Sequence, residues 1–188
     1  MGFFDNLKKK TEEAVKQVFN SGSKTITFDD IPTTLEAFKA LPQASLKDPY
    51  ETAALAIVAL NLYPADKEVC FEMLNYVRGP RPLSAFDKTF INDRLAYDGK
   101  EYVVRSYFEG TSPANDYTPS EPYKITLTSN QYSEIEGGYL QLWVRSSGAD
   151  NPRPVMLRNK PSTGEWFLWE HEGLLADIRV PASKNEWA

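Results

Sequence analysis

Side chains that commonly carry out catalysis or bind metals are few in this sequence. It contains one histidine, His171, and one cysteine, Cys70. Any site that needs two imidazoles, and any zinc site built from several cysteines, is therefore excluded. Glutamates on both sides of His171 favour its charged form, and because it follows a predicted strand we expect it in an exposed turn. Cys70 lies on the apolar face of a predicted helix, so we expect a buried, unreactive thiol.

Sequence motifs with a known catalytic mechanism are missing as well. Ser21 and Lys24 have the Ser-x-x-Lys spacing of some acyl-transfer enzymes, but the companion motifs of those enzymes are not present. The sequence has no glycine-rich phosphate loop, no nucleophile elbow and no HExxH pair. Neighbouring carboxylates, such as Asp29 and Asp30, fit no EF-hand spacing. The sequence therefore identifies no catalytic residue, no metal ligand and no cofactor.

A candidate binding surface comes from runs of aromatic and β-branched residues that alternate with a period of two. These predicted strands cover residues 102–108, 123–128, 139–145, 154–159 and 165–169. If the strands are neighbours, cations and aromatic rings share the face opposite the core, where an anionic or planar ligand or a peptide could bind. The alternative is that arginine stems cover aromatic rings and only stabilise an exposed sheet. The candidate residues are Arg105, Tyr107, Trp143, Arg145, Arg158 and Trp169.

Residues 2–19 provide a second candidate surface, because their apolar side chains repeat with the period of an amphipathic helix. Such a helix can lie on a membrane surface, with lysines near anionic headgroups, or pack on the domain or on a partner helix. Residues 20–24 have the composition of a linker, so we predict a helix and linker over residues 1–22. The contact residues of this surface would be Phe3, Phe4, Leu7, Lys8 and Lys10.

The remaining residues, 23–188, are predicted to form a single α+β domain, with a helical half at about 30–96 and a sheet half at about 97–181. Residues 53–60 are apolar all round, which indicates a helix buried on most sides, and residues 65–77 continue with helical spacing. We expect N-terminal helices packed on a mainly antiparallel sheet of five or six strands, with a short strand at 24–28. A cone-shaped, curved sheet that encloses a pocket is the alternative.

Helix starts are predicted at Thr33 with Glu36, Asp48 with Pro49 and Glu51, and Ser84 with Asp87.

Composition restricts the class of protein and its partners. Hydrophobic residues make up 41% of the chain and charged residues 25%, as in an ordinary globular domain. The formal net charge of -5 argues against nucleic acid as a partner, because phosphates are bound by an excess of cations. No apolar run approaches the roughly 20 residues that a transmembrane helix needs. With one cysteine and no signal peptide, we expect a cytoplasmic protein, with attachment to the inner membrane face as an alternative.

Three stretches carry a resemblance to a known family. They are Ser-Tyr-Phe-Glu-Gly-Thr-Ser-Pro at 106–113, Pro-Val-Met-Leu-Arg at 154–158 and Glu-Trp-Phe-Leu-Trp-Glu at 165–170. The region that contains them, about 50–181, resembles an uncharacterised bacterial family known as a domain of unknown function. The resemblance implies a bacterial cytoplasmic protein and assigns no activity.

These observations favour a non-enzymatic module that binds a protein or a small anionic ligand. Its contacts would come from the sheet face and from the long connection 109–122, because long loops in compact domains are often functional. The arginines of the face would pair with charge, and its aromatic residues would stack. One alternative is a hydrolase that uses a carboxylate in a pocket between helices and sheet. Another is a peripheral membrane protein attached through residues 2–19.

Overall fold

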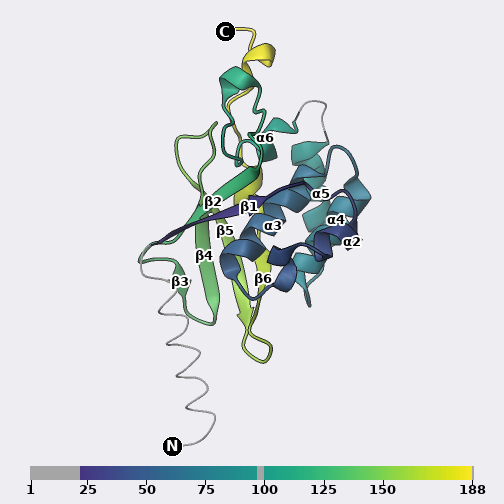
Figure 1. Ribbon diagram of the computed structural model, residues 1–188, viewed down its shortest axis with the longest axis vertical. Helices are drawn as coiled ribbons and strands as arrows, with labels where there is room; N and C mark the ends of the chain where they lie inside the picture. The colour runs from purple at the N-terminus through teal and green to yellow at the C-terminus, as the bar shows by residue number, and fades with distance from the viewer. Residues whose placement is uncertain (1–21, 97–99, 188) are drawn as a thin grey trace, which may run out of the picture.

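The computed structural model describes residues 22–96 and 100–187 (Figure 1). The predicted amphipathic helix at 2–19, with its five candidate contact residues, lies outside these ranges. The described helices are α2 Leu35–Lys39, α3 Pro49–Asn61, α4 Lys67–Arg78, α5 Ala85–Leu95 and α6 Tyr102–Arg105. The strands are β1 Ser23–Phe28, β2 Tyr123–Thr128, β3 Glu134–Ile135, β4 Tyr139–Val144, β5 Arg153–Lys160 and β6 Glu165–Glu170. Short 3-10 turns are η1 Pro42–Ser45, η2 Pro113–Asn115, η3 Glu172–Leu175 and η4 Ala182–Lys184.

Side-chain caps fix where the helices begin. The Asp48 carboxylate accepts hydrogen bonds from the backbone N–H groups of Tyr50 and Glu51, which starts α3 as predicted. Ser84 and Asp87 form a reciprocal capping box at the start of α5, also as predicted. The cap of α2 is Thr34, one residue later than predicted. Each cap accepts hydrogen bonds from backbone N–H groups of the first turn, which have no carbonyl partner within the helix. Because the cap and these donors lie within three residues of each other, the sequence alone indicates where the helices begin.

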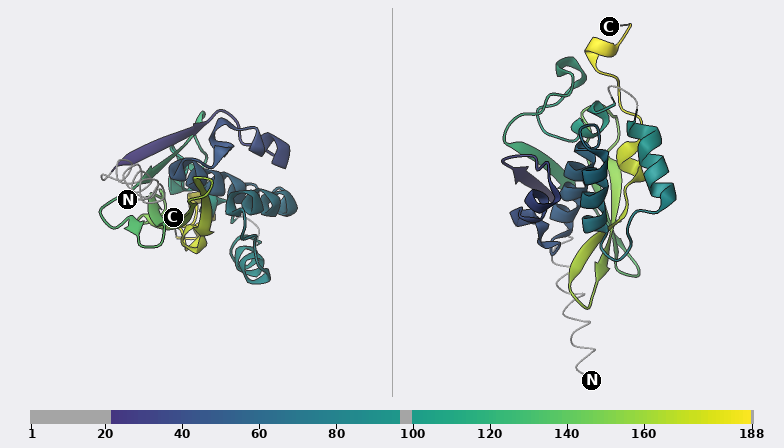
Figure 2. Two further views of the ribbon diagram at one scale, coloured as in Figure 1. Left: turned by 90° about the horizontal axis from the view of Figure 1, so that it is seen from below. Right: turned by 90° about the vertical axis from the view of Figure 1, so that its right-hand side faces the viewer.

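Helix α3 is the centre of the core. All residues from Thr52 to Leu60 are fully buried, as the uninterrupted apolar run predicts. The helix contacts β1, β2, β4, β5 and β6, while α4 covers its outer side. The helices α2 to α5 lie on one side of the sheet, which curls around α3 (Figure 2). The fold is therefore α+β with a curled antiparallel sheet, and α3 fills the concave side where the alternative fold would hold a pocket.

The sheet is antiparallel throughout, in the order β1-β2-β4-β5-β6, with β3 paired to β4. Strands β2 to β6 follow one another along the chain as a meander, and β1 adds to the outer edge of β2. The predicted hairpin turn at 161–164 joins β5 to β6, and Gly164 there takes the left-handed φ of +68°. Core residues pair across the strands, as Leu140 does with Leu157 and Leu142 with Val155.

The predicted strand at 102–108 is wrong. Residues 102–105 form α6, and a turn follows. Tyr102, Val103 and Val104 are all buried, although an alternating strand would bury only every second residue. Contacts of α6 with α3 and η3 override the β-propensity of these residues. The six-stranded sheet is completed instead by β1 and the short β3.

None of the helices within the described ranges is both long enough and apolar enough to cross a bilayer.

Candidate functional site

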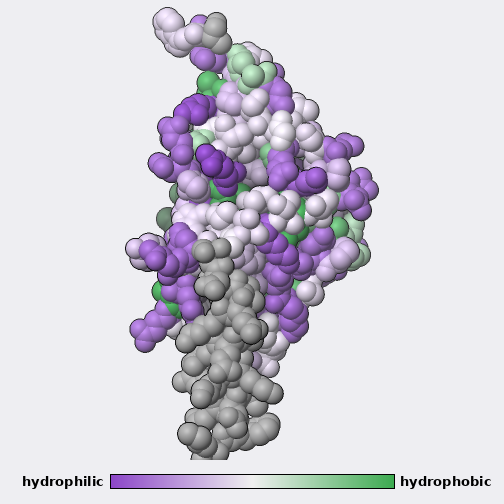
Figure 3. All heavy atoms as spheres, turned by 60° about the vertical axis from the view of Figure 1, so that its left-hand side comes forward, coloured by the Kyte–Doolittle hydropathy of each residue, from purple (hydrophilic) through white to green (hydrophobic). Residues whose placement is uncertain are grey.

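The outer face of the sheet carries three of the six residues that the sequence predicts for binding. In β4 and β6 the buried residues alternate with half-exposed ones, so Tyr139, Trp143 and Trp169 point away from α3. Arg158 is exposed on β5 between them. Figure 3 shows the molecule turned so that the left-hand side of Figure 1 comes forward. On the surface seen in this view, hydrophobic residues are scattered among hydrophilic ones.

Three strands bring two aromatic rings and a guanidinium into contact on this face. The Arg158 guanidinium carbon lies 4.9 Å from the ring centroid of Tyr139 and 4.8 Å from that of Trp169. The two rings meet edge to face with their centroids 5.3 Å apart. The register explains the contact, because Tyr139 pairs with Arg158 across β4 and β5. Cross-strand pairing therefore places the cation against both rings.

A second arginine joins this cluster from outside the sheet. The guanidinium carbon of Arg81 lies 4.2 Å from the Trp169 ring, and its Nη1 donates to the Trp169 carbonyl at 3.0 Å. Arg81 follows α4 in the turn that Gly79 begins, and Gly79 packs directly against Phe167 of β6. Arg81 was not among the predicted binding residues, although the glycine and prolines around it, Gly-Pro-Arg-Pro at 79–82, are typical of a turn. We call Arg81, Tyr139, Trp143, Arg158 and Trp169 the cation–aromatic face.

Three predicted binding residues, Arg105, Tyr107 and Arg145, are not part of this face. Arg105 is exposed on α6. Tyr107 is buried, and its hydroxyl donates to the carbonyl of Leu174 at 2.8 Å. Burial raises the pKa of Tyr107, so this side chain is a neutral core residue. Both placements follow from the absence of a strand at 102–108. Trp143 pairs with Thr128 and Pro154 on the face, and Arg145 is exposed just beyond the end of β4.

The arginines of the face lack carboxylate partners. Within the described residues, neither Arg81 nor Arg158 forms an ion pair with an acidic side chain, and Arg145 beyond the end of β4 forms none either. By contrast, Lys24 near the other edge of the sheet pairs with Asp48 at 2.6 Å and with Glu51 at 3.3 Å. The guanidinium donors of Arg158 are thus positioned by aromatic rings and remain available to an anion.

The predicted functional loop at 109–122 is tied down by its own side chains. Tyr117 is fully buried, stacks on Tyr102 with ring centroids 5.6 Å apart, and donates its hydroxyl to the carbonyl of Arg179 at 2.6 Å. The Asn115 amide donates to the carbonyls of Gly110 and Thr118. These contacts hold the loop against α6 and the C-terminal segment, at the end of the molecule where the C-terminus lies (Figure 1).

A polar cluster is buried at the boundary between the helices and the sheet. His171, predicted to be exposed, is fully buried there, because η3 folds back under α5. Its Nδ1 lies 3.4 Å from Nη1 of Arg78, and Nη2 of Arg78 lies 3.4 Å from Oδ2 of Asp87. Ser84 donates to the same Asp87 oxygen through its N–H and its hydroxyl, both at 2.7 Å. The cluster joins the start of α5, the end of α4 and the end of β6.

This cluster does not suit a metal ion. Possible ligand atoms of Asp87, His171 and Glu172 lie within 4.8 Å of one another. The buried Arg78 guanidinium already contacts both Asp87 and His171, so a divalent cation would meet a positive charge at short range. Burial alone would raise the pKa of Asp87, but hydrogen bonds from Ser84 and the charge of Arg78 outweigh it, and the pKa is lowered. Asp87 is therefore a structural anion that neutralises Arg78.

Comparison with protein families gives one match. Residues 30–182 match the model of the family described as Domain of unknown function (DUF6935). Comparisons with curated proteins and with solved structures found no match.

Proposed function

The chain belongs to this family, and we propose that it is a non-enzymatic binding module whose cation–aromatic face binds an acidic segment of a partner protein. The observation that carries the proposal is the Arg158 guanidinium, which packs against the rings of both Tyr139 and Trp169 without an acidic partner among the described residues. A carboxylate from another protein would supply that partner.

The geometry of Arg158 favours binding in two ways. The two rings restrict the side chain before a ligand arrives, so less conformational entropy is lost on binding. The flat guanidinium keeps N–H donors at its edge, where a carboxylate can accept two parallel hydrogen bonds. Arg81 adds a second cation 4.2 Å from the centroid of the same indole, so an acidic segment would meet two positive charges at Trp169.

The shape of the face favours a protein partner over a small molecule. The face is the outer side of a sheet that curls around α3, so it cannot enclose a ligand (Figure 2). Small-molecule sites bury most of the ligand in a concave pocket, whereas a peptide or protein can lie along an open surface. Tyrosine, tryptophan and arginine are also the residues enriched in protein interfaces.

Tryptophan signals offer a direct test. The chain has four tryptophans: Trp143 and Trp169 on the face, Trp166 in the core and Trp187 exposed near the C-terminus. Titration of the full chain with a peptide of alternating glutamate and tyrosine should shift the indole N–H resonances of Trp143 and Trp169. The resonances of Trp166 and Trp187 should stay in place. Equal shifts of Trp187 would indicate non-specific binding and would contradict the proposal.

Matched arginine variants distinguish binding at the cation–aromatic face from non-specific attraction to positive charge. Arg158→Gln should weaken peptide binding at least about tenfold, because one charge-assisted pair contributes about 1.5–3 kcal/mol. Arg105→Gln removes the same charge from an exposed site on α6 and should leave binding unchanged. If both variants bind the peptide as tightly as the parent chain does, the face has no binding role.

The hydrolase alternative has less support. A general acid in such an enzyme needs a carboxyl group with a raised pKa. Asp87 is the buried carboxylate at the helix–sheet boundary, and its pKa is lowered. Its position suits charge pairing with Arg78, not proton transfer.

The proposal fits a reducing compartment such as the cytoplasm. Cys70 is a free thiol, fully buried, and burial raises its pKa, so it is protected from oxidation. Contact of residues 2–19 with a membrane surface is a separate proposal that rests on the sequence pattern of that segment. Vesicle co-sedimentation of the full chain and of a chain that begins at Gly22 would test it, and equal pelleting would exclude a membrane role.

A further inference from the structure

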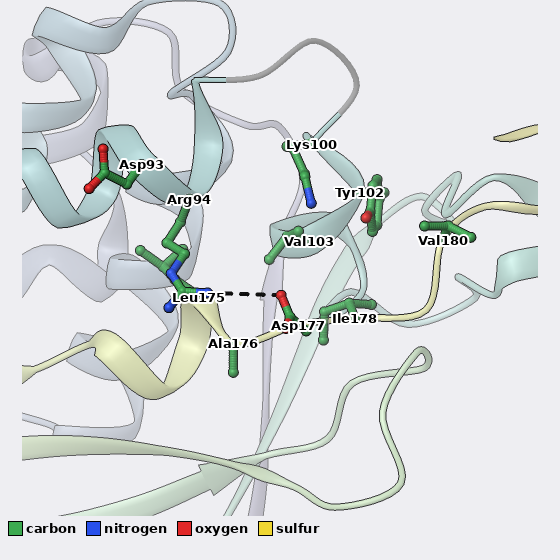
Figure 4. Close-up of a pocket in the computed structure, with 10 residues that line it drawn as sticks. All are labelled: Asp93, Arg94, Lys100, Tyr102, Val103, Leu175, Ala176, Asp177, Ile178 and Val180. Carbon is green, nitrogen blue, oxygen red and sulfur yellow. Dashed lines mark ion pairs between the residues drawn. The ribbon is translucent and has the colours of Figure 1, made fainter. Parts of the chain in front are cut away.

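A cavity of about 330 Å³ lies between the end of α5, helix α6 and the segment that follows η3 (Figure 4). It lies away from the cation–aromatic face and shares no residue with it. Its volume falls at the lower end of the range for small-molecule sites. A small ligand with a short hydrocarbon chain would therefore fit inside it.

One side of the cavity is apolar. Val103 of α6, Leu175 of η3 and Ile178 of the C-terminal segment line it, and all three are buried. Val180 adds an apolar side chain that is 46% exposed. This wall can remove a short hydrocarbon chain from water.

Two cations approach the cavity from different sides, Arg94 from α5 and Lys100 from the chain just before α6 (Figure 4). Arg94 pairs with Asp177 across the cavity at 3.9 Å, at the limit of an ion pair. The side chains are 44% and 97% exposed, so solvent screens the attraction between them. An incoming anion can therefore replace Asp177 as the partner of Arg94 at little cost.

The parts of the cavity are held in position. The Arg94 guanidinium lies 5.3 Å from the ring centroid of Phe90, one turn earlier on α5. Arg153 of β5 donates from Nη2 to the carbonyl of Asp177 at 2.7 Å, which fixes the backbone of the segment that forms the wall. The cation and the apolar wall thus keep a fixed spacing before a ligand binds.

The geometry points to a binding site for a small monocarboxylate with a short unbranched apolar tail. Its carboxylate would accept hydrogen bonds from Arg94, with Lys100 beside it, and its tail would lie against Val103, Leu175 and Ile178. A single negative charge fits better than a phosphate, because Asp93 and Asp177 also line the cavity and would repel a dianion. This site is independent of the proposed partner-binding face.

Hexanoate is a suitable probe, and 1-hexanol is its uncharged match. Titration of the full chain, followed by NMR of the backbone and methyl groups, should give saturable shifts at Val103, Leu175 and Ile178. We expect a dissociation constant on the order of 1 mM for so small a ligand. Hexanol and inorganic phosphate should each bind about tenfold more weakly, since one lacks the charge and the other lacks the tail.

Variants test each half of the site. Arg94→Gln should weaken hexanoate binding about tenfold, and Ala176→Leu should also weaken it by occupying part of the cavity. Lys88→Gln is the matched control, because Lys88 lies on the same helix over Phe71 and does not line the cavity. Thermal unfolding of each variant confirms that it is folded. Equal binding of hexanoate and hexanol, tighter binding of phosphate, unchanged affinity of Arg94→Gln, or no saturable shift at about 10 mM ligand would each overturn the inference.

Discussion

The Arg78 guanidinium and the His171 ring lie side by side in the interior, with Nη1 of Arg78 3.4 Å from Nδ1 of His171, although 93 positions separate them in the sequence. Both side chains are almost fully buried. Because a guanidinium only donates hydrogen bonds, Nδ1 must accept, and the ring is neutral with its proton on Nε2. Nε2 is buried without a hydrogen-bond partner in the described part of the chain. Protonation of this ring would place two cations in contact inside the protein.

The first prediction concerns acid stability. Burial is the main cause that lowers the pKa of His171, and the charge of Arg78 adds to it, while Glu172 and Asp87 oppose it. The unfolded chain therefore takes up this proton more readily, at a pKa near 6.5. The contribution of neutral His171 to the free energy of unfolding is therefore fully present above that value. It is lost as the pH drops towards the pKa of His171 in the folded protein. Urea unfolding of the parent chain should show this loss between about pH 7 and 5.

His171→Gln provides the control for this slope, because glutamine does not titrate. Its free energy of unfolding should depend less on pH over the same interval, whatever its value at pH 7. Titration of Asp87, whose pKa is lowered in the folded protein, changes the free energy of unfolding only at more acidic pH, because the pKa of an aspartate in the unfolded chain is near 3.9. Parallel pH profiles for the two proteins would show that His171 does not control the acid response.

A second prediction concerns the buried ion pair. Arg78→Met leaves the Asp87 carboxylate buried without its cation and should lower the free energy of unfolding by about 3–5 kcal/mol. Arg158→Met, at an exposed arginine, should change it by less than about 1 kcal/mol. Adding Asp87→Asn to Arg78→Met should recover part of the loss, since the unpaired charge is then removed. Denaturant titrations at pH 7 would measure all three, and similar losses for the two arginine variants would contradict the prediction.

The third prediction concerns the contact between α4 and β6. Gly79 has φ +56°, and a Cβ there would lie 2.2 Å from Cε1 of Phe167. Gly164 has a similar φ of +68° with no atom within 4 Å of its added Cβ. Both alanine variants carry the cost of a left-handed residue, but Gly79→Ala should lose about 1–3 kcal/mol more through the clash. Equal losses in thermal or denaturant unfolding would mean that Phe167 moves aside freely.

The fourth prediction concerns the single thiol. Burial raises the pKa of Cys70, and the charge of Asp66 adds to the shift, so the reactive thiolate is rare in the folded protein. A disulfide reagent should react with Cys70 slowly in buffer and rapidly in denaturant, at a rate in buffer that follows the opening of the fold. Rapid reaction of the native protein would show that α4 opens locally.

The elements that depend on neighbouring residues were predictable from the sequence. The caps at Asp48 and Ser84 act within three residues of the helix start, and the run at 53–60 is apolar on every side. The strands at 123–128, 139–145, 154–159 and 165–169 were found because alternation and turn residues are local signals. From these elements follow the α+β class, the meander and the placement of Trp143, Arg158 and Trp169 on one face.

Contacts between distant residues decided the rest. Residues 102–108 have strand propensity, yet packing against α3 and η3 makes them a helix and a turn and buries Tyr107. His171 is polar and flanked by glutamates, yet the ion pair of Arg78 and Asp87 gives it a place in the interior. Arg81 reaches Trp169 across 88 positions of sequence. Such contacts leave no periodic pattern in the chain, because burial and pairing depend on which surfaces the finished fold brings together.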